Sequence, residues 1–471
     1  MVGYNVAKRS TTQMKLRLFT RHDTINRRIF RAAITIGVAT VVVKAVTTAK
    51  DLAVARYFGR NDQLDSFLFA FMLPAFAVSL VVGAISAALV PVLVDTRQKD
   101  GILAGQQLLS SVFLLMIILL VAVAVLLGVL APFFLPYLAH NFSPEKQALT
   151  RDFLYLLIPW LVASGMAMFI AYILNSIEKF AIPALLPILT PMATLACIIL
   201  WRRPVTGYSL AAGAVGGGVL EAVLLCWLVR RHELLGRFRW YGLSPRVRAV
   251  LHQTGPMMAG GLLMGATPLV DQYMASMLAP GSVAALSYGS KVTSVLFAIG
   301  ATALSTATLP YFSKMTAEGD WLGCRHTLKR YSAVILAIGV PVTALLVLCS
   351  RPVIRLLFER GAFTSADTDL VSRVQAFYCL QIPFYALCVL FVRFISAVRR
   401  NDLLMYASAI NLVVDVTMNL ILMRWLGVSG IALSTSFVMV GSFTFLFLSS
   451  RRLLSRQATV DLSAVPVTVR Q

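Results

Sequence analysis

The feature that most constrains the fold of this chain is a series of long apolar runs. The run from Val112 to Leu130 contains no charged residue, and as a helix it is long enough to cross the roughly 30 Å hydrocarbon core of a bilayer. Hydrophobic residues make up 58% of the chain and charged residues only 13%, which is far more apolar than an ordinary soluble domain. The runs lack the alternation of barrel strands, and in lipid a helix satisfies its own backbone groups. The sequence therefore predicts an all-α polytopic membrane protein.

The breakers between these runs predict about twelve transmembrane helices in two similar halves. Ser86 to Pro91 aligns with Ser305 to Pro310, and Ile158 to Trp160 aligns with Ile382 to Phe384. Because an even number of helices separates the copies, the repeat is parallel, and we expect two pseudo-symmetric six-helix lobes around a central cavity. The expected helices lie at about residues 31–58, 65–95, 104–138, 150–175, 179–201, 206–230, 250–279, 283–313, 328–350, 370–398, 402–425 and 427–450.

The basic residues behind the formal net charge of +22 gather between the apolar runs. This pattern indicates cytoplasmic loops in a multi-pass membrane protein, with both termini in the cytoplasm. It argues against a nucleic-acid partner, which would need the charges on one folded face. The predicted divisions are a basic cytoplasmic arm (1–30), an N-terminal six-helix lobe (31–230), a basic cytoplasmic linker (231–249), a C-terminal six-helix lobe (250–450) and a cytoplasmic tail (451–471).

A polar stripe runs along the first predicted helix. Lys44, Thr47, Thr48 and Asp51 are spaced so that they share one face of a helix. Charges at membrane depth cost several kcal/mol unless they are paired or hydrated, so the stripe predicts a water-filled cavity. The alternative is a Lys44–Asp51 ion pair that only fixes helix packing.

Two further lysines suggest what such a cavity would bind. Lys50 lies beside the stripe, and Lys291 lies in the eighth predicted helix. If Lys44, Lys50 and Lys291 converge near Asp51, their ammonium groups suit an anionic ligand such as a pyrophosphate. These four residues form the predicted substrate site.

A second polar cluster is expected in the C-terminal half. Asn411 and Asp415 are four residues apart on one face of the eleventh helix, and Asp271 lies in the seventh. Two carboxylates and an amide oxygen suit a sodium ion, or a carboxyl group that carries a proton. The alternative is that Arg393 in the tenth helix neutralises Asp271 or Asp415 as a fixed ion pair.

The sequence carries no recognisable catalytic motif. It has no Gly-x-Ser-x-Gly, no phosphate-binding glycine-rich loop with Lys-Ser or Lys-Thr, and no His-Glu-x-x-His. The six cysteines have no spacing typical of a metal site. We therefore expect a transporter rather than an enzyme, with no cofactor except a sodium ion.

Four segments resemble one known family. Ala49 to Gly59, Asp65 to Pro74, Ala88 to Leu93 and Leu357 to Thr364 are similar to motifs of MurJ/MviN-type flippases, which belong to the multidrug/oligosaccharidyl-lipid/polysaccharide exporter superfamily. The resemblance extends from about residue 31 to 452. It implies alternating-access transfer of a lipid-linked saccharide from the inner to the outer leaflet of the bacterial inner membrane, with membrane lipids as the surrounding partners.

The resemblance also bears on the two predicted sites. The three lysines fall where lipid II flippases usually carry arginines in the central cavity, and Asp271, Asn411 and Asp415 fall where some members are thought to bind sodium.

Two departures from the family bear on the substrate. Those flippases carry a paired arginine and a glutamate in the second helix, where this chain has the apolar stretch 77–83, and they usually have two further C-terminal helices. We therefore expect an undecaprenyl-pyrophosphate-linked saccharide for cell-surface or exopolysaccharide assembly. The alternatives are lipid II of peptidoglycan synthesis and, in the same superfamily, a drug or organic-cation antiporter, whose cargo the lysines would repel.

Overall fold

A computed structural model describes residues 35–177, 179–201, 205–231 and 239–463, and these contain helices and no strand. The predicted arm at 1–30 lies outside the described residues. The first helix covers residues 35–58. The others are α2 (Asp62–Leu138), α3 (Pro144–Ser176), α4 (Ala181–Leu185), the 3-10 helix η1 (Leu186–Ile188), α5 (Leu189–Leu200), α6 (Tyr208–Arg231), α7 (Pro245–Ser276), α8 (Ser282–Gly289), α9 (Lys291–Ala317), α10 (Trp321–Leu348), α11 (Ser350–Phe358), α12 (Ser365–Cys379), α13 (Ile382–Ala397), α14 (Asn401–Leu426) and α15 (Val428–Ser463).

These helices agree with the predicted membrane spans. Nine stretches of the described chain are long and apolar enough to cross a bilayer. The longest, α2, contains two spans, because Gly101 leaves the helical conformation with φ 86° and turns the chain. Residues 35–58 and α7 complete the predicted set of twelve.

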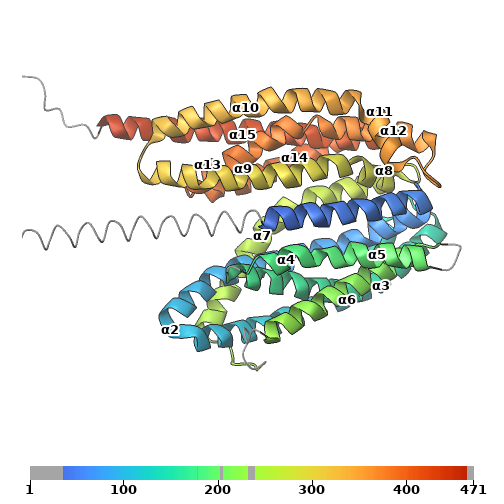
Figure 1. The fold of residues 1–471 in the computed structure, drawn as a ribbon, viewed down its shortest axis with the longest axis horizontal. Coiled ribbons are helices and arrows are strands. Elements are labelled where there is room, and N and C mark those ends of the chain that lie inside the picture. Colours follow the sequence, from blue (N-terminus) through green and yellow to red (C-terminus); the bar gives the residue numbers. More distant parts are fainter. Residues whose placement is uncertain (1–34, 178, 202–204, 232–238, 464–471) are drawn as a thin grey trace, which may run out of the picture.

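The helices pack as two lobes that lie side by side, with α7 passing between them (Figure 1). In the N-terminal lobe, α2, α3 and α6 bury large side chains such as Phe113, Leu157 and Phe169 against one another. In the C-terminal lobe, α9, α10, α13, α14 and α15 surround a smaller cluster that contains Phe312 and Phe394. The helix α7 packs on α2 and on α14, so it connects the two lobes.

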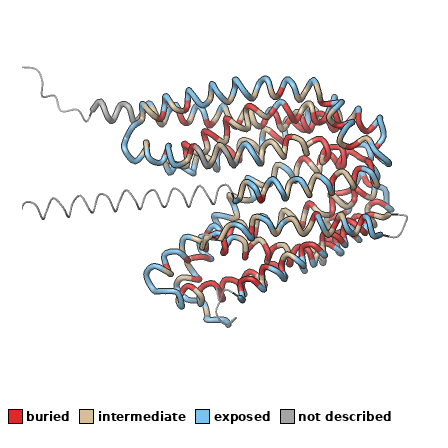
Figure 2. The backbone as a smooth tube through the Cα atoms, in the orientation of Figure 1, coloured by how far each residue is buried: buried red, intermediate tan, exposed pale blue. Residues whose placement is uncertain are grey.

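A third apolar cluster joins the lobes at one end of the molecule. It combines Val54 and Phe58 of the first helix with Tyr288 of α8, Val371 of α12 and Phe363 of the loop before α12. Figure 2 shows many buried residues at this end, whereas the two lobes diverge toward the other end. The lobes are therefore closed against each other at the end that carries α8 and α12.

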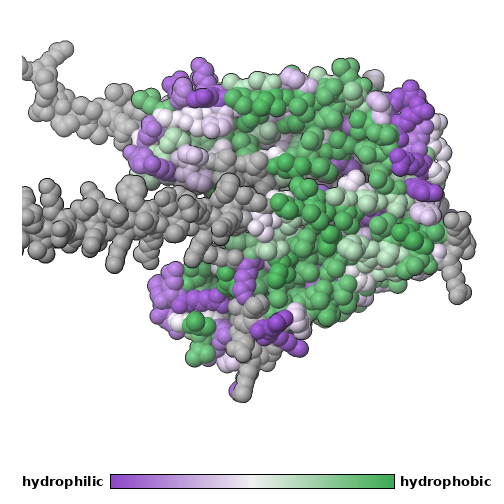
Figure 3. Space-filling model, viewed as in Figure 1, coloured by the Kyte–Doolittle hydropathy of each residue, from purple (hydrophilic) through white to green (hydrophobic). Residues whose placement is uncertain are grey.

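The surface has the pattern of a membrane protein. In Figure 3 a hydrophobic belt covers the middle of both lobes, and hydrophilic residues gather at the two ends. The clearest case is α10, because only 6% of its most apolar stretch is buried inside the protein. Lipid rather than protein covers such a helix.

The predicted boundaries of the linker and tail stay predictions. Residues 232–238 of the linker lie outside the described residues, and α7 begins at Pro245. The last helix, α15, runs on to Ser463 and so extends into the predicted tail. One helix lies where a loop was expected: α11 occupies residues 350–358 after α10.

Candidate functional site

A cavity of about 650 Å³ lies in the N-terminal lobe and reaches the start of the C-terminal lobe. Residues 35–58 and helices α2, α3, α5 and α6 supply most of its wall, and α8 and α9 close one side. Most of the lining is apolar. Its charged residues are Lys50, Asp51, Glu221 and Lys291.

Three of these charges form one ion-paired group across the two lobes. Lys50 Nζ lies 2.8 Å from Asp51 Oδ1, and Lys291 Nζ lies 3.0 Å from Asp51 Oδ2. The carboxylate is 9% exposed, whereas the lysine side chains are 24% and 33% exposed. Two ammonium groups around one carboxylate leave one positive charge in excess, and the lysines remain accessible from the cavity.

The structure brings three of the four predicted substrate-site residues together and leaves Lys44 apart. Lys44 is half-buried and does not line this cavity. The Lys44–Asp51 pair considered as the alternative does not form, because Asp51 is held by the other two lysines. Thr47 lines the cavity, although its hydroxyl donates to the Val43 carbonyl of its own helix at 2.8 Å.

Trp160 and Glu221 are polar lining residues that the sequence analysis did not predict. Trp160 of α3 is buried, and its indole Nε1 has no hydrogen-bond partner among the described residues. Glu221 of α6 lies in the same lining. Glu221 could have been predicted, because an acidic residue inside an apolar run is unusual. Trp160 could not, because a tryptophan is common in such a run.

The predicted cation site is a buried polar cluster between α7, α14 and α15. Asp271 Oδ1 accepts a hydrogen bond from Asn419 Nδ2 at 2.9 Å, and Asp271 Oδ2 lies 3.5 Å from the Thr435 hydroxyl. Asp415 is 0% exposed, and neither of its carboxylate oxygens has a hydrogen-bond donor among the described residues. The Asp271 and Asp415 carboxyl groups are close enough to interact. Two adjacent buried carboxylates require a shared proton or a cation.

The other two predicted residues of this region behave differently. Asn411 Nδ2 donates to the Ser442 hydroxyl at 3.3 Å, and Asn411 Oδ1 has no partner in the described chain. Arg393 donates from Nε to the Ser305 hydroxyl at 3.0 Å, and no ion pair joins it to either aspartate within the described residues. The fixed ion pair considered as the alternative is therefore not formed.

One member of the cluster, Asn419, was not predicted. It continues the spacing of Asn411 and Asp415 along one face of α14, and it is 0% exposed. Its side-chain oxygen accepts a hydrogen bond from the Ser434 hydroxyl of α15. The four-residue spacing from Asp415 could therefore have predicted Asn419 as a member of the cluster.

The closed end of the molecule is held by charges that cross between the lobes. Asp65 of α2 accepts hydrogen bonds from the backbone N–H groups of Gly281 at 2.6 Å and Ala284 at 2.8 Å, at the start of α8. Such an acid is stabilised at a helix N-terminus. Lys146 of α3 lies 3.0 Å from Asp65 and balances its charge.

Two of the segments that carried the family resemblance meet at this end. The Ala362 N–H donates to the Arg56 carbonyl at 2.8 Å, and just beyond the two segments Arg60 Nε lies 2.6 Å from Asp367 Oδ1. Gly361 has φ +64°, and a Cβ there would lie 2.3 Å from the Arg56 carbonyl oxygen, so only glycine fits. We call the contacts of Arg56, Arg60, Asp65, Gly281, Ala284, Ala362 and Asp367 the inter-lobe latch.

Several known proteins are similar to this chain in sequence, in fold or in both. The family model described as lipid II flippase MurJ matches residues 54–469. The probable lipid II flippase MurJ of Rickettsia prowazekii (strain Madrid E) is 24% identical over 416 residues, which are 87% of this chain and 81% of that protein. That of Rhizobium meliloti (strain 1021) is 26% identical over 407 residues, which are 84% and 76% of the two chains.

Solved structures agree on the fold. The structure described as lipid II flippase MurJ in an inward closed conformation matches with a TM-score of 0.77 and 22% identity over 93% of each chain. A crystal structure of a mutant of the Vibrio cholerae MATE transporter VcmN matches with a TM-score of 0.66 and 13% identity over 92% of this chain and 98% of that chain. At such identities the likeness is one of fold, whereas the family model covers most of the sequence. The chain belongs to the lipid II flippase MurJ family.

Proposed function

We propose that this protein transfers a lipid-linked peptidoglycan precursor of the lipid II type from the inner to the outer leaflet of the bacterial cytoplasmic membrane. The observation that carries the proposal is the group formed by Lys50, Asp51 and Lys291 in the cavity. A pyrophosphate that enters meets two ammonium groups whose charge one carboxylate only partly neutralises. Family membership supplies the lipid-linked class of cargo.

The position of these residues supports a coupling of binding to lobe movement. Lys50 belongs to the first helix and Lys291 to α9, so a pyrophosphate held by both would contact both lobes. A ligand shifts a conformational equilibrium only through its different affinity for the two states. Separation of the lobes would separate the lysines, so the cargo would be bound more tightly in one state than in the other.

The remaining polar groups of the cavity suit the head group of such a cargo. Trp160 offers an unused indole N–H and Glu221 offers carboxylate oxygens, and both are complementary to hydroxyl and amide groups. The inter-lobe latch closes the end that the charge pattern assigns to the outside, so release would require its ion pairs to break.

We also propose that sodium is the coupling ion. Asp271 and Asp415 would hold it, with Asn411 one turn away on α14, because neither the Asp415 carboxylate oxygens nor the Asn411 carbonyl oxygen has a hydrogen-bond donor in the described chain. Sodium accepts such oxygen ligands and would offset the repulsion of the two carboxylates. The three residues lie on α7 and α14, so the ion would stabilise one packing of these helices.

The alternative substrates are less well supported. The first expectation was a saccharide for surface or exopolysaccharide assembly, which would present the same pyrophosphate to Lys50 and Lys291. The comparisons favour the peptidoglycan precursor over it, because the matching family and the relatives are described as lipid II flippases. A cationic drug would be repelled by the excess positive charge of the cavity.

Reconstitution tests the choice of substrate. Purified full-length protein in proteoliposomes is supplied with fluorescent lipid II or with an undecaprenyl-pyrophosphate oligosaccharide that lacks the peptide, and transfer is followed by quenching from outside. We expect faster transfer of lipid II. Equal or faster transfer of the peptide-free lipid would assign the protein to polysaccharide export instead.

A further inference from the structure

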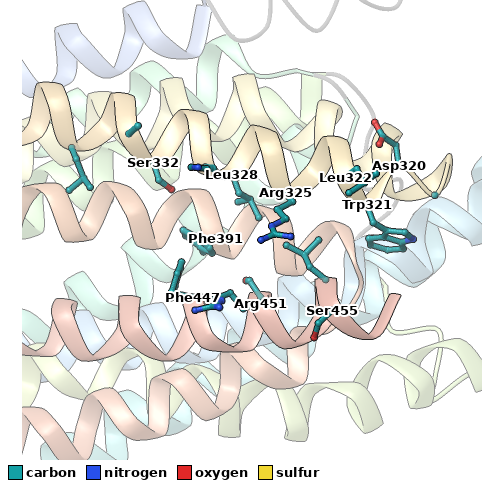
Figure 4. Close-up of a pocket in the computed structure, with 16 residues that line it drawn as sticks. Asp320, Trp321, Leu322, Arg325, Leu328, Ser332, Phe391, Phe447, Arg451 and Ser455 are labelled. Atoms are coloured by element: carbon teal, nitrogen blue, oxygen red, sulfur yellow. The ribbon is translucent and has the colours of Figure 1, made fainter. Parts of the chain in front are cut away.

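A second cavity, unrelated to the substrate cavity, opens between α10, α13 and α15 (Figure 4). Its volume is about 1040 Å³, and it shares no lining residue with the cavity of Lys50 and Lys291. It lies where α10 begins and α15 nears its end, which is the end of the lobe away from the inter-lobe latch (Figure 1). Because α10 is hardly buried inside the protein, this groove opens toward lipid.

The two long helices of the groove contribute the same order of side chains. From the end of the bundle inward, α10 presents Arg325, then Ser332, then Leu336. From the same end, α15 presents Arg451 and Ser450, then Phe447. On α10 these positions are seven and four residues apart, and on α15 Ser450 and Arg451 lie three and four residues after Phe447, so each set lies on the side of its helix that faces the groove. The groove is cationic near the membrane surface and apolar deeper in.

The cations of the groove have no acidic partner in the described chain. No ion pair within it involves Arg325, Lys329 or Arg451. The one acid in the lining, Asp320, caps its own helix by accepting a hydrogen bond from the Gly323 N–H at 2.7 Å. Figure 4 shows Arg325 pointing from α10 toward α15. The groove therefore concentrates positive charge that its own residues do not neutralise.

Two hydroxyl groups in the groove are also without partners. Ser450 is 1% exposed, and neither its hydroxyl nor that of Ser332 has a hydrogen-bond partner among the described residues. A serine in a helix usually bonds to its own backbone when nothing else is available. Below them, the rings of Phe391 and Phe447 meet with centroids 5.9 Å apart and form an apolar floor.

We propose that this groove binds one anionic glycerophospholipid, of the phosphatidylglycerol type. The phosphate would lie between Arg325, Lys329 and Arg451, and an acyl chain would lie along Phe391 and Phe447. Basic residues between helices at a membrane surface are suited to anionic head groups, and Trp321 at the mouth is typical of that depth. A second copy of this chain is a poorer occupant, because a symmetric contact would bring like charges together.

Native mass spectrometry of the purified full-length protein tests the proposal. The protein is titrated with phosphatidylglycerol and with phosphatidylcholine of the same acyl chains. We expect one tightly bound phosphatidylglycerol, and a preference for it of about thirtyfold or more over phosphatidylcholine, as two or three cations at about 1 kcal/mol each would supply. The double variant Arg325→Gln, Arg451→Gln should bind both lipids equally.

The matched control is Arg330→Gln with Arg452→Gln, which removes the same charge from the same two helices outside the groove. This control should keep the preference, and melting curves of both double variants should match the wild type. If both double variants lose the preference for phosphatidylglycerol to the same extent, the preference comes from general surface charge and the proposal is wrong. Displacement of the bound lipid by undecaprenyl phosphate, or a dimer that excludes it, would also overturn the proposal.

Discussion

Among the single residues, Asp51 has the most specific role, because its carboxylate allows two lysines to share one cavity. Replacing either lysine by glutamine removes an ammonium group from the proposed pyrophosphate site but leaves the other pair intact. We expect Lys50→Gln and Lys291→Gln to slow lipid II transfer in proteoliposomes by about tenfold or more, as for the loss of a charge-assisted hydrogen bond. The arginine variants should lose less, because they keep the charge.

The control for this prediction is Lys44→Gln, which lies on the same helix outside the cavity. Its transfer rate should stay close to that of the wild type. If Lys44→Gln slows transfer as much as Lys50→Gln, the substrate contacts lie along the whole polar stripe and the assignment to this cavity is wrong.

Asp415 gives a separate prediction about sodium. Sodium that binds only the folded protein stabilises it by about 2.7 kcal/mol at one hundred times the dissociation constant. Melting curves of the wild type should therefore shift upward in sodium relative to choline, and Asp415→Ala should abolish the shift. Lys50→Gln should keep it, because Lys50 is not part of the cluster. An identical wild-type melting curve in both salts would remove sodium from the account.

At this scale the sequence revealed which residues were unusual but not what they touch. Asp51, Lys50 and Lys291 were identified because they are charged residues inside apolar runs. Their contact could not be predicted, because Lys291 lies far from Asp51 along the chain. Lys44 fitted the helical stripe equally well, and only the packing of α9 against the first helix separates it from Lys50. The Arg393 ion pair was equally compatible with the sequence, but Arg393 reaches Ser305 instead.

Among the elements, the loop between α11 and α12 illustrates how a short motif can join two lobes. Gly361 and Gly319 both have a positive φ, but only Gly361 is crowded, by the Arg56 carbonyl. Both alanine variants should lose about 1 kcal/mol because alanine disfavours a positive φ. Gly361→Ala should lower the melting temperature clearly more than Gly319→Ala, because its Cβ would also clash with the Arg56 carbonyl. Equal losses would mean that the loop can move away from Arg56, and that it does not fix the latch.

The helices themselves were largely predictable, because apolar runs and their breakers set the spans. The turn at Gly101 separates the two spans of α2, as expected from the polar stretch around it. The short helix α11 was missed because its alternation of arginines and apolar residues resembles a surface loop. Its amphipathic pattern has meaning only once Ile354 and Phe358 are seen to be buried.

For the whole molecule, the latch predicts how the lobes respond to a lost ion pair. Arg60→Gln breaks the pair with Asp367, which is largely shielded from solvent, whereas Arg351→Gln breaks an exposed pair at the same end. Spin labels at Glu145→Cys and Arg373→Cys, in a background without native cysteines, report the distance between the lobes. Arg60→Gln should add a longer-distance population, and Arg351→Gln should not, because exposed pairs contribute little. Unchanged distances in Arg60→Gln would show that the pair does not hold the lobes together.

The two-lobe architecture followed from the internal repeat, but the contacts that close it did not. The latch joins Asp65 to backbone groups of Gly281 and Ala284, and no pattern in the sequence specifies a backbone partner. The orientation of the termini toward the cytoplasm stays a prediction from the basic loops.

The most direct test of the account is whether this protein alone can supply outer-leaflet lipid II in living cells. In a bacterial strain depleted of its own lipid II flippase, the chain is expressed and lipid II at the cell surface is measured by its cleavage with an externally added enzyme. The account predicts that wild-type protein restores cleavage and growth, and that Lys291→Gln, expressed to the same level, restores neither. Growth without cleavable lipid II at the surface, or no rescue by correctly inserted wild-type protein, would contradict it.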